Sequence, residues 1–325
     1  MRVFMLFFLF LSVIVTLQAQ KDSISPISIG FNHGRGFIMS HSPNMARLAN
    51  RHISTNEIYF EFNSHGKKDW HQRFNFPSTG FTVKHFKLNN PQMLGNALAI
   101  GSFLKLKLIS GKNAMLTIKP TIGLGYIQKT FDEDLNYRNI AIGSNINMYL
   151  SVVANFETKI YQSVYSSIGL SFDHMSNTGF QSPNLGINMP LIYAGVKTDL
   201  GKKKLFKYKT ESKYEPTKYK WRIETAVGLN EKNPAKGKKY LAKALFIKRE
   251  KKINRKSSIG FGIDLYNNPA NQAILSEQER DISNIENTQL AASINHALHF
   301  GKLKFTSQLS YYLISENEDL GNVYH

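Results

Sequence analysis

Hydrophobic residues alternate with polar or small residues along most of this chain. In the stretch SSIGFGIDLY, residues 257–266, Ile259 and Phe261 share one parity, while serine, glycine and aspartate occupy the other. Successive side chains of a β-strand point to opposite faces, so such a stretch predicts a strand with one apolar and one polar face. The same pattern recurs in residues 115–126 and 302–313. Because helices are hardly indicated anywhere, the alternation predicts an all-β fold.

The length of these stretches favours strands that cross a membrane. We count about thirteen, each with roughly the 9–11 residues that a tilted membrane-spanning strand needs. No segment after residue 20 is a continuous apolar run of the length that a membrane-spanning helix requires. The sequence therefore predicts an antiparallel transmembrane β-barrel of the outer membrane with about 12–14 strands, eight of them before residue 201. A soluble secreted sandwich or lipocalin-like barrel also alternates and remains the alternative, and it would partition into water without detergent.

The two faces of the predicted strands have different expected surroundings. Small polar residues and glycines are expected in the lumen, which in an eight-stranded barrel is filled by side chains and leaves no pore. Aromatic residues near strand ends are expected to form girdles at the membrane interfaces. The residues assigned to these girdles are Tyr59, Tyr149, Tyr161 and Tyr311.

The first twenty residues indicate export. In MRVFMLFFLFLSVIVTLQAQ, Arg2 precedes an apolar core from Val3 to Val15, and Ala19 precedes a polar start. This order is typical of a secretory signal peptide, and the core is too short for a membrane anchor. The chain contains no cysteine, which excludes a small secreted domain held together by disulfides.

The formal charge of +18 predicts an anionic partner. For an exported protein a phosphorylated glycolipid or membrane surface fits better than nucleic acid, although lysines that only solubilise loops would give the same excess. The densest lysine cluster divides the chain, which predicts residues 1–20 as signal peptide, 21–201 as barrel strands, 202–220 as a solvated linker and 221–325 as further strands. An odd strand number and a polar end lead us to expect an incomplete C-terminus.

Loop lengths predict the orientation of the barrel, because outer-membrane barrels have short periplasmic turns and long outer loops. If the first strand, at about 27–38, starts in the periplasm, most of the long connections lie outside. The predicted outer loops are residues 39–54, 128–146, 177–188, 230–239 and 267–287. The long connections 64–78 and 201–220 depart from the rule.

One strand carries a polar pair on its apolar face. In VYSSIGLSFDHMSN, residues 164–177, Leu170 and Phe172 have the same parity as His174 and Ser176, so all are expected to point outward. The predicted orientation places the pair at the outer end of the strand, level with headgroups and acyl-ester linkages. Polar groups on this face are costly unless they are used, and the competing interpretation is that they mark where the strand enters water.

This stretch resembles the lipid A 3-O-deacylase family, outer-membrane barrels that hydrolyse an acyl ester of lipopolysaccharide. The matching residues are His174, Ser176, Asn177, Gly179, Pro183, Asn184 and Gly186. The resemblance extends from the signal peptide through the first eight strands. It implies an outer-membrane esterase that uses neither cofactor nor metal and acts on lipid A or lipopolysaccharide, with no nucleic acid as partner and with protein partners unknown.

By that resemblance Ser176 is the nucleophile and His174 the general base. The family has an acidic residue where this chain has Asn188, whose side-chain oxygen could still orient the imidazole but supplies no negative charge. The missing charge therefore predicts an activity that is reduced, redirected to another acyl ester, or absent.

Further roles follow from position in the motif. Amides at Asn177 and Gly179 are the expected oxyanion donors, because they form a turn just beyond the nucleophile. Pro183, Asn184 and Gly186 are expected to shape the loop that follows.

The sequence leaves an alternative function and a further candidate site open. In the alternative function the protein is a non-catalytic barrel, either a channel or a structural protein, and the missing acid marks a degenerate motif. The histidines His33, His41 and His52 lie near the first outer loop, but their spacing matches no known ligand pattern and favours solvated loop residues over a metal site.

Overall fold

The structure is a computed structural model that describes residues 23–49, 51–209, 214, 217–231, 237–270, 288–314 and 323–324. The predicted signal peptide and most of the predicted outer loop 267–287 lie outside the described residues. The chain divides into two compact units. One runs to Asn177 and resumes over Leu185–Lys209, and the other comprises Thr178–Asn184 and the residues from Thr210 onward.

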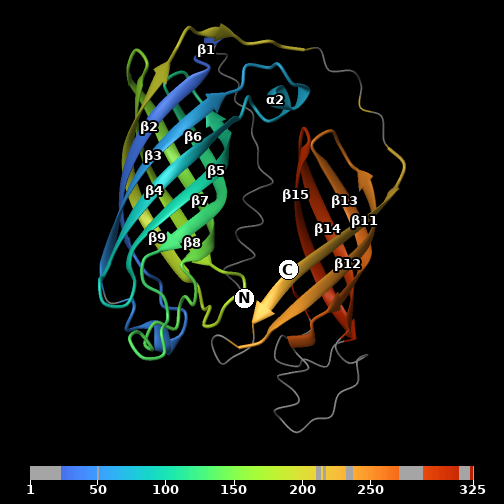
Figure 1. The fold of residues 1–325 in the computed structure, drawn as a ribbon. Helices are drawn as coiled ribbons and strands as arrows, with labels where there is room; N and C mark the ends of the chain where they lie inside the picture. Colours follow the sequence, from blue (N-terminus) through green and yellow to red (C-terminus); the bar gives the residue numbers. More distant parts are fainter. Residues whose placement is uncertain are drawn as a thin grey trace. The chain divides into compact units, whose positions relative to one another are not determined.

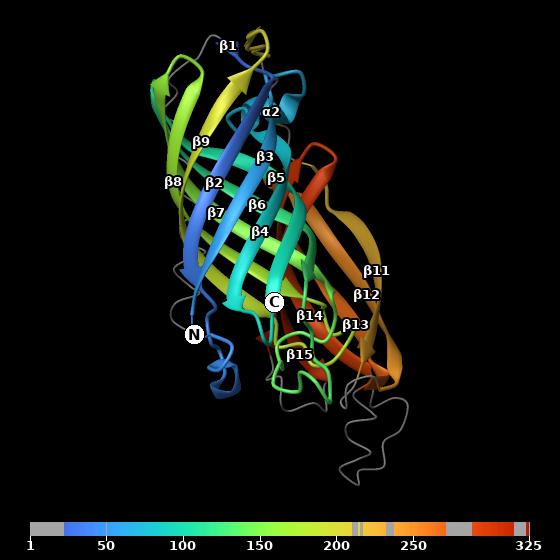
Figure 2. The same cartoon turned by 60° about the vertical axis from the view of Figure 1, so that its left-hand side comes forward.

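The first unit contains a closed barrel of eight antiparallel strands (Figure 1, Figure 2). Its strands are β2 (Ile27–Phe37), β3 (His52–Asn63), β4 (Ser78–Asn90), β5 (Gly95–Ser110), β6 (Ala114–Ile127), β7 (Ile146–Tyr161), β8 (Val164–Ser176) and β9 (Ile187–Leu200). Each strand pairs with the next, and β2 pairs with β9 to complete the cylinder. The all-β fold and the eight-stranded part predicted from the alternation are confirmed.

The barrel is apolar outside and polar inside, as the alternation predicts. On β3, Ile58 and Phe60 are about half exposed, whereas Glu57 and Glu61, which flank this stretch on either side, are buried. An outer surface of this kind is typical of a barrel surrounded by lipid. Its large exposed side chains include Ile27, Phe31, Phe81, Val83, Ile100, Ile122, Leu124, Val152, Phe156, Ile168, Leu170, Ile192 and Val196. Among the described residues no helix is long and apolar enough to cross a membrane.

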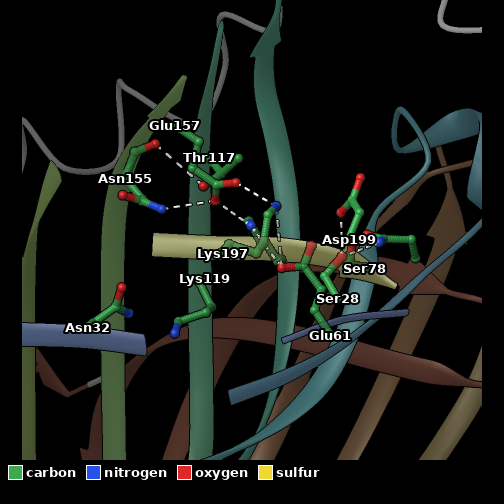
Figure 3. A network of polar contacts seen from close by, with 12 residues as sticks. Ser28, Asn32, Glu61, Ser78, Thr117, Lys119, Asn155, Glu157, Lys197 and Asp199 are labelled. Atoms are coloured by element: carbon green, nitrogen blue, oxygen red, sulfur yellow. Dashed lines mark hydrogen bonds and ion pairs between the residues drawn. The ribbon is translucent and has the colours of Figure 1, made fainter. Parts of the chain in front are cut away.

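Ion pairs fill much of the barrel interior. Four buried lysines face four buried carboxylates there: Lys84, Lys105, Lys119 and Lys197 with Glu57, Glu61, Glu157 and Asp173. Figure 3 shows part of this network, in which the Nζ atom of Lys197 lies 2.7 Å from Glu157 Oε2. Buried charges are tolerated only when they are paired and hydrogen-bonded. The lumen is therefore occupied by side chains that compensate one another's charge.

The interior becomes apolar toward the end where β8 finishes. The loop between β2 and β3, which includes the short 3-10 helix η1 (Pro43–Met45), contributes buried Ile38, Met45 and Leu48 to this cluster. Strand residues Phe86 and Met175 are fully buried beside them. At the other end the connection between β3 and β4 carries the short helix α2 (Asp69–Arg73) (Figure 2).

Two of the four tyrosines assigned to interfacial girdles lie inside the barrel. Tyr59 and Tyr149 are almost completely buried, while Tyr161 and Tyr311 are exposed. Tyr59 has the same parity as the lumenal Glu57 and Glu61, so its position in the strand pattern, and not its place near the strand end, decides where it points.

Part of the predicted lysine-rich linker packs on the barrel. Strand β10 (Lys204–Leu205) pairs with β1 (Ser23–Ile24), and Lys207 N–H donates to the carbonyl of His65. The reason lies in the aromatic residues between the lysines, because Phe206 packs on Phe76 with ring centroids 4.4 Å apart. This stretch is therefore ordered by apolar contact despite its charge.

The second unit contains an antiparallel sheet of its own. Its strands, in spatial order, are β11 (Lys220–Glu231), β12 (Lys239–Lys252), β13 (Ser257–Asn267), β14 (Thr288–Phe300), β15 (Leu303–Ile314) and β16 (Val323–Tyr324). One face holds polar clusters around Glu250 and Asp264, and the other exposes residues such as Phe261, Ile294 and Phe305. These strands repeat the apolar-out, polar-in pattern but do not extend the eight-stranded barrel.

Candidate active site

The predicted catalytic residues His174 and Ser176 lie at the C-terminal end of β8. Along this strand Leu170 and Phe172 are exposed on the outer face, and Ser171 and Asp173 are buried in the lumen. His174 and Ser176 continue the outer series but are half-buried and buried. The loop before β9 lies against both, since a Cβ atom at Gly186 would be within 3.4 Å of each side chain. The predicted outward position of the pair therefore agrees with the observed strand.

Three side chains at this position form a continuous chain of hydrogen bonds. The Nε2 atom of His174 lies 2.9 Å from the hydroxyl oxygen of Ser176. On the other side of the ring, Nδ1 of His174 lies 2.6 Å from the side-chain oxygen of Asn188. Asn188 is the second residue of β9 and pairs directly with His174 across the two strands. The register of the barrel thus brings together residues that the motif places fourteen positions apart.

The chemistry of these groups determines the protonation pattern. An amide oxygen can only accept, so Nδ1 of His174 carries a proton and donates it to Asn188. In a neutral imidazole the other nitrogen is then an acceptor, which leaves Nε2 free to accept the Ser176 proton. This is the tautomer that a general base for a serine hydroxyl requires.

The backbone at Gly186 allows the imidazole to occupy this position. Gly186, in the loop before β9, has a φ of +76°, and a Cβ atom there would lie 2.9 Å from Cε1 of His174. Its N–H donates to the carbonyl of Ala141, in the loop between β6 and β7, at 3.0 Å. A larger residue would both strain the backbone and push the ring, so the predicted loop-shaping role has a steric reason at this position.

Asn177 lies directly after the pair, and its side chain contacts Ser144. The side chain is buried, and its nitrogen donates to the hydroxyl of Ser144 at 3.0 Å. Ser144 belongs to the loop between β6 and β7, so this contact ties that loop to the end of β8. No sequence pattern indicates this contact, because Ser144 lies in a loop 33 positions away along the chain.

The other predicted loop residues belong to a segment that packs with the second unit. Gly179 has a φ of +88°, and its carbonyl accepts a hydrogen bond from the Glu231 N–H at 2.9 Å. Ser182 N–H donates to the Glu231 carboxylate, and the bond between Ser182 and Pro183 is cis. Because Thr178–Asn184 groups with this unit, the site described here consists of barrel residues alone.

Nearby carboxylates serve other purposes. Asp173, the residue before His174, points into the lumen and accepts hydrogen bonds from Lys84, Tyr149 and Ser171. Glu157 is likewise lumenal and binds Lys105 and Lys197. Asn188 is thus the residue that contacts Nδ1 of His174 in the place where the motif predicts an acid.

The three histidines near the first loop do not come together as a metal site. His33 lies on β2 with Nδ1 2.9 Å from the side-chain oxygen of Asn56. His41 instead lies beside the candidate site, where the side-chain nitrogen of Asn188 is 3.4 Å from its Nδ1. Within the described part of the chain, no group of three or more His, Asp or Glu residues could hold a metal ion.

An apolar surface adjoins the pair on the outside of the barrel. Leu150 on β7 pairs with His174, and Phe172 pairs with Pro190 on β9. Leu150 and Phe172 are both exposed, as are Leu170 and Ile192 farther from the strand end. A closed barrel with an apolar outer surface is typical of an outer-membrane protein, and a serine–histidine pair is an arrangement that hydrolases use.

Two known family models match the chain. The family model for lipid A 3-O-deacylase (PagL) matches residues 55–197, and the model for the C-terminal domain of acyloxyacyl hydrolase matches residues 219–325. The barrel part of the chain therefore matches the lipid A 3-O-deacylase family, as the motif around His174 predicts, and the remainder matches a domain of acyloxyacyl hydrolase. The protein is accordingly a hydrolase of the outer membrane.

Solved structures show only distant likeness. The crystal structure of Neisserial surface protein A shares 11% identity at a TM-score of 0.39, covering 54% of this chain and 98% of that one. The crystal structure of the outer membrane enzyme PagL shares 15% identity at a TM-score of 0.36, covering 51% of this chain and 97% of that one. No curated protein sequence matches the chain.

Proposed function

We propose that this protein removes an ester-linked acyl chain from lipid A, or from a related acylated glycolipid, with Ser176 as nucleophile and His174 as general base. The observation that carries the proposal is the hydrogen-bond chain from Ser176 through His174 to Asn188 at the rim of an apolar-surfaced barrel. The match to this family supports the substrate class.

The reaction proceeds in two steps. As the Ser176 oxygen attacks the ester carbonyl carbon, Nε2 of His174 takes the hydroxyl proton. The tetrahedral intermediate then collapses, the bond to the sugar oxygen breaks, and His174 returns the proton to that oxygen. In the second step His174 takes a proton from water as the water oxygen attacks the acyl carbon. The bond from that carbon to the Ser176 oxygen then breaks, His174 returns the proton to this oxygen, and the free fatty acid leaves.

The surroundings of the pair suit a lipid substrate. An acyl chain in the bilayer can lie along the exposed Leu150 and Phe172 while its ester linkage reaches Ser176 at the rim. The backbone amide of Asn177 is our candidate for an oxyanion donor, since it directly follows the nucleophile. Gly179, predicted for the same role, belongs to the segment that groups with the second unit. With the predicted orientation, this rim faces the outer leaflet, and an N-terminal signal peptide directs the export.

Asn188 sets the expected rate. Its oxygen holds the imidazole in the required tautomer, but a neutral amide does not stabilise the imidazolium that forms during attack. We therefore expect a slower enzyme than one with a carboxylate at this position.

A non-catalytic barrel is the second candidate, and Asn188 is the specific observation that favours it. The channel version of this candidate is opposed by the lumen, where buried ion pairs occupy the space that a pore would need. A structural barrel whose motif has lost its acid is the form that the test must distinguish.

Mass spectrometry of lipid A tests the proposal. Cells would express the full-length chain or its Ser176→Ala variant, with both proteins confirmed in the outer membrane. Loss of one acyl chain that is retained in cells with the variant supports the esterase and its nucleophile, and the mass and position of the loss name the bond. Unchanged lipid A with the unaltered chain would favour the non-catalytic barrel, and deacylation by the Ser176→Ala variant would exclude the nucleophile.

A further inference from the structure

His41 lies next to the candidate site from a different part of the chain. It belongs to the loop between β2 and β3 and is 147 positions from Asn188 in sequence. Two contacts join this loop to the start of β9: Met39 N–H donates to the Asn188 carbonyl at 2.8 Å, and the Asn188 side-chain nitrogen lies 3.4 Å from Nδ1 of His41. The amide of Asn188 is therefore held between two histidines, with its oxygen toward His174 and its nitrogen toward His41.

An amide at this position has an orientation problem that a carboxylate does not have. Both oxygens of a carboxylate accept hydrogen bonds, so turning it over changes nothing. If the Asn188 amide turned over, its nitrogen would face Nδ1 of His174, which would then have to accept instead of donate. The neutral imidazole would carry its proton on Nε2 and could no longer accept the proton of Ser176.

The partner on the other side of the amide can select the orientation. A side-chain nitrogen of asparagine only donates, so Nδ1 of His41 accepts and its own proton sits on Nε2. Water would not select, because it donates and accepts equally well. If the amide turned over beside His41, this histidine would have to move its own proton from Nε2 to Nδ1, so it adds a cost that water does not.

We propose that His41 is a positioning residue for the deacylation reaction: it fixes the amide orientation of Asn188 and thereby the tautomer of His174. The expected effect on kcat rests on the proposed function, whereas the expected tautomer of His174 does not depend on it. This role arises only because the chain has an amide at position 188, where the orientation of the side chain matters.

A double-mutant cycle on the full chain in outer-membrane vesicles tests the kinetic consequence. We expect His41→Ala to lower kcat roughly three- to tenfold, the effect of one modest hydrogen bond, with KM little changed. His41→Gln should restore only part of the rate, because its side-chain amide can present either its acceptor oxygen or its donor nitrogen to Asn188. His33→Ala is the matched control, since His33 is also exposed but contacts Asn56, and its rate should be unaltered.

The decisive comparison uses the Asn188→Asp background, where orientation no longer matters. There His41→Ala should leave kcat unchanged relative to Asn188→Asp alone. An equal loss in both backgrounds would show that His41 acts by packing or folding of the loop, and no loss in either would show that it does not position Asn188. Both results overturn the proposal.

A spectroscopic measurement separates this proposal from the proposed function. In protein with ¹⁵N-labelled histidine, the His174 signals, assigned by their loss in a His174→Gln variant, report which ring nitrogen carries the proton. We expect the proton on Nδ1 in the unaltered chain and a shift toward Nε2 in His41→Ala. The same tautomer in both proteins would overturn the proposal even if the enzyme is active, and a shift would support it even if lipid A is not the substrate.

Discussion

The side-chain oxygen of Asn188 lies 2.6 Å from Nδ1 of His174, directly across the pair formed by β8 and β9. The contact reproduces with an amide the geometry that an acid has in a serine–histidine–acid triad. It orients the imidazole and selects its tautomer, while leaving the charge of the imidazolium without a neutralising partner. Much of what can be measured on this protein follows from that difference.

Restoring the charge should accelerate the reaction. We expect Asn188→Asp to raise kcat, because a carboxylate that accepts from Nδ1 stabilises the imidazolium formed during attack. Removing the contact with Asn188→Ala should lower kcat by about 10- to 100-fold, the effect of a hydrogen bond to a charged group. Deacylation kinetics with purified lipid A in detergent provide the measurement, and a slower Asn188→Asp enzyme would mean that another group supplies the charge.

A methyl group at Gly186 should disturb the site more than the fold. Its Cβ would lie 2.9 Å from Cε1 of His174, and a φ of +76° is unfavourable for alanine. We expect Gly186→Ala to reduce kcat strongly while lowering the free energy of unfolding by only about 1–3 kcal/mol.

Gly228→Ala provides the matched control for this variant, because a Cβ there would meet nothing within 4 Å. We measure kcat and the free energy of unfolding in urea for both variants. Both quantities should fall in Gly186→Ala and should match those of the unaltered chain in Gly228→Ala. Full activity in Gly186→Ala would show that the imidazole has room that the structure does not indicate.

Removing a lumenal carboxylate should destabilise the barrel without removing the nucleophile or base. Asp173 is completely buried and lies 2.8 Å from the Nζ atom of Lys84. Asp173→Ala leaves that lysine without its partner, which typically costs about 3–5 kcal/mol. We expect easier unfolding in urea, and partial recovery in the double variant Asp173→Ala with Lys84→Met. A variant as stable as the unaltered chain would show that water replaces the carboxylate.

The second sheet should expose one face to lipid. On β14, Ile294 is 62% exposed and its neighbour Ser293 is 4% exposed, so the two point to opposite faces. Because the chain has no cysteine, Ile294→Cys and Ser293→Cys can each carry a single spin label. In outer membranes we expect the label at 294 to be reached by oxygen dissolved in lipid and shielded from a water-soluble nickel complex. Equal access of the nickel complex to both labels would argue that this sheet lies in water.

Several features of the barrel could be predicted because they depend only on neighbouring positions. The parity of residues along β8 places Leu170, Phe172 and His174 on one face whichever strands lie beside it. The same rule places Tyr59 in the lumen with Glu57 and Glu61, whereas its position near a strand end wrongly predicted a place in an interfacial girdle. Local periodicity is therefore the more reliable guide to which face a residue occupies.

The alternation and the spacing of His174 and Ser176 were sufficient to predict an outer-membrane barrel, its eight-stranded part and a neighbouring serine–histidine pair, since each depends on residues close in sequence. Only the tertiary structure decided that the strands after residue 219 form a separate sheet, that Asn188 faces His174 and that His41 contacts Asn188. These arrangements depend on strand register, on barrel closure and on how a distant loop folds over the rim. The free energy of packing the whole chain selects them, and no short stretch of sequence records that choice.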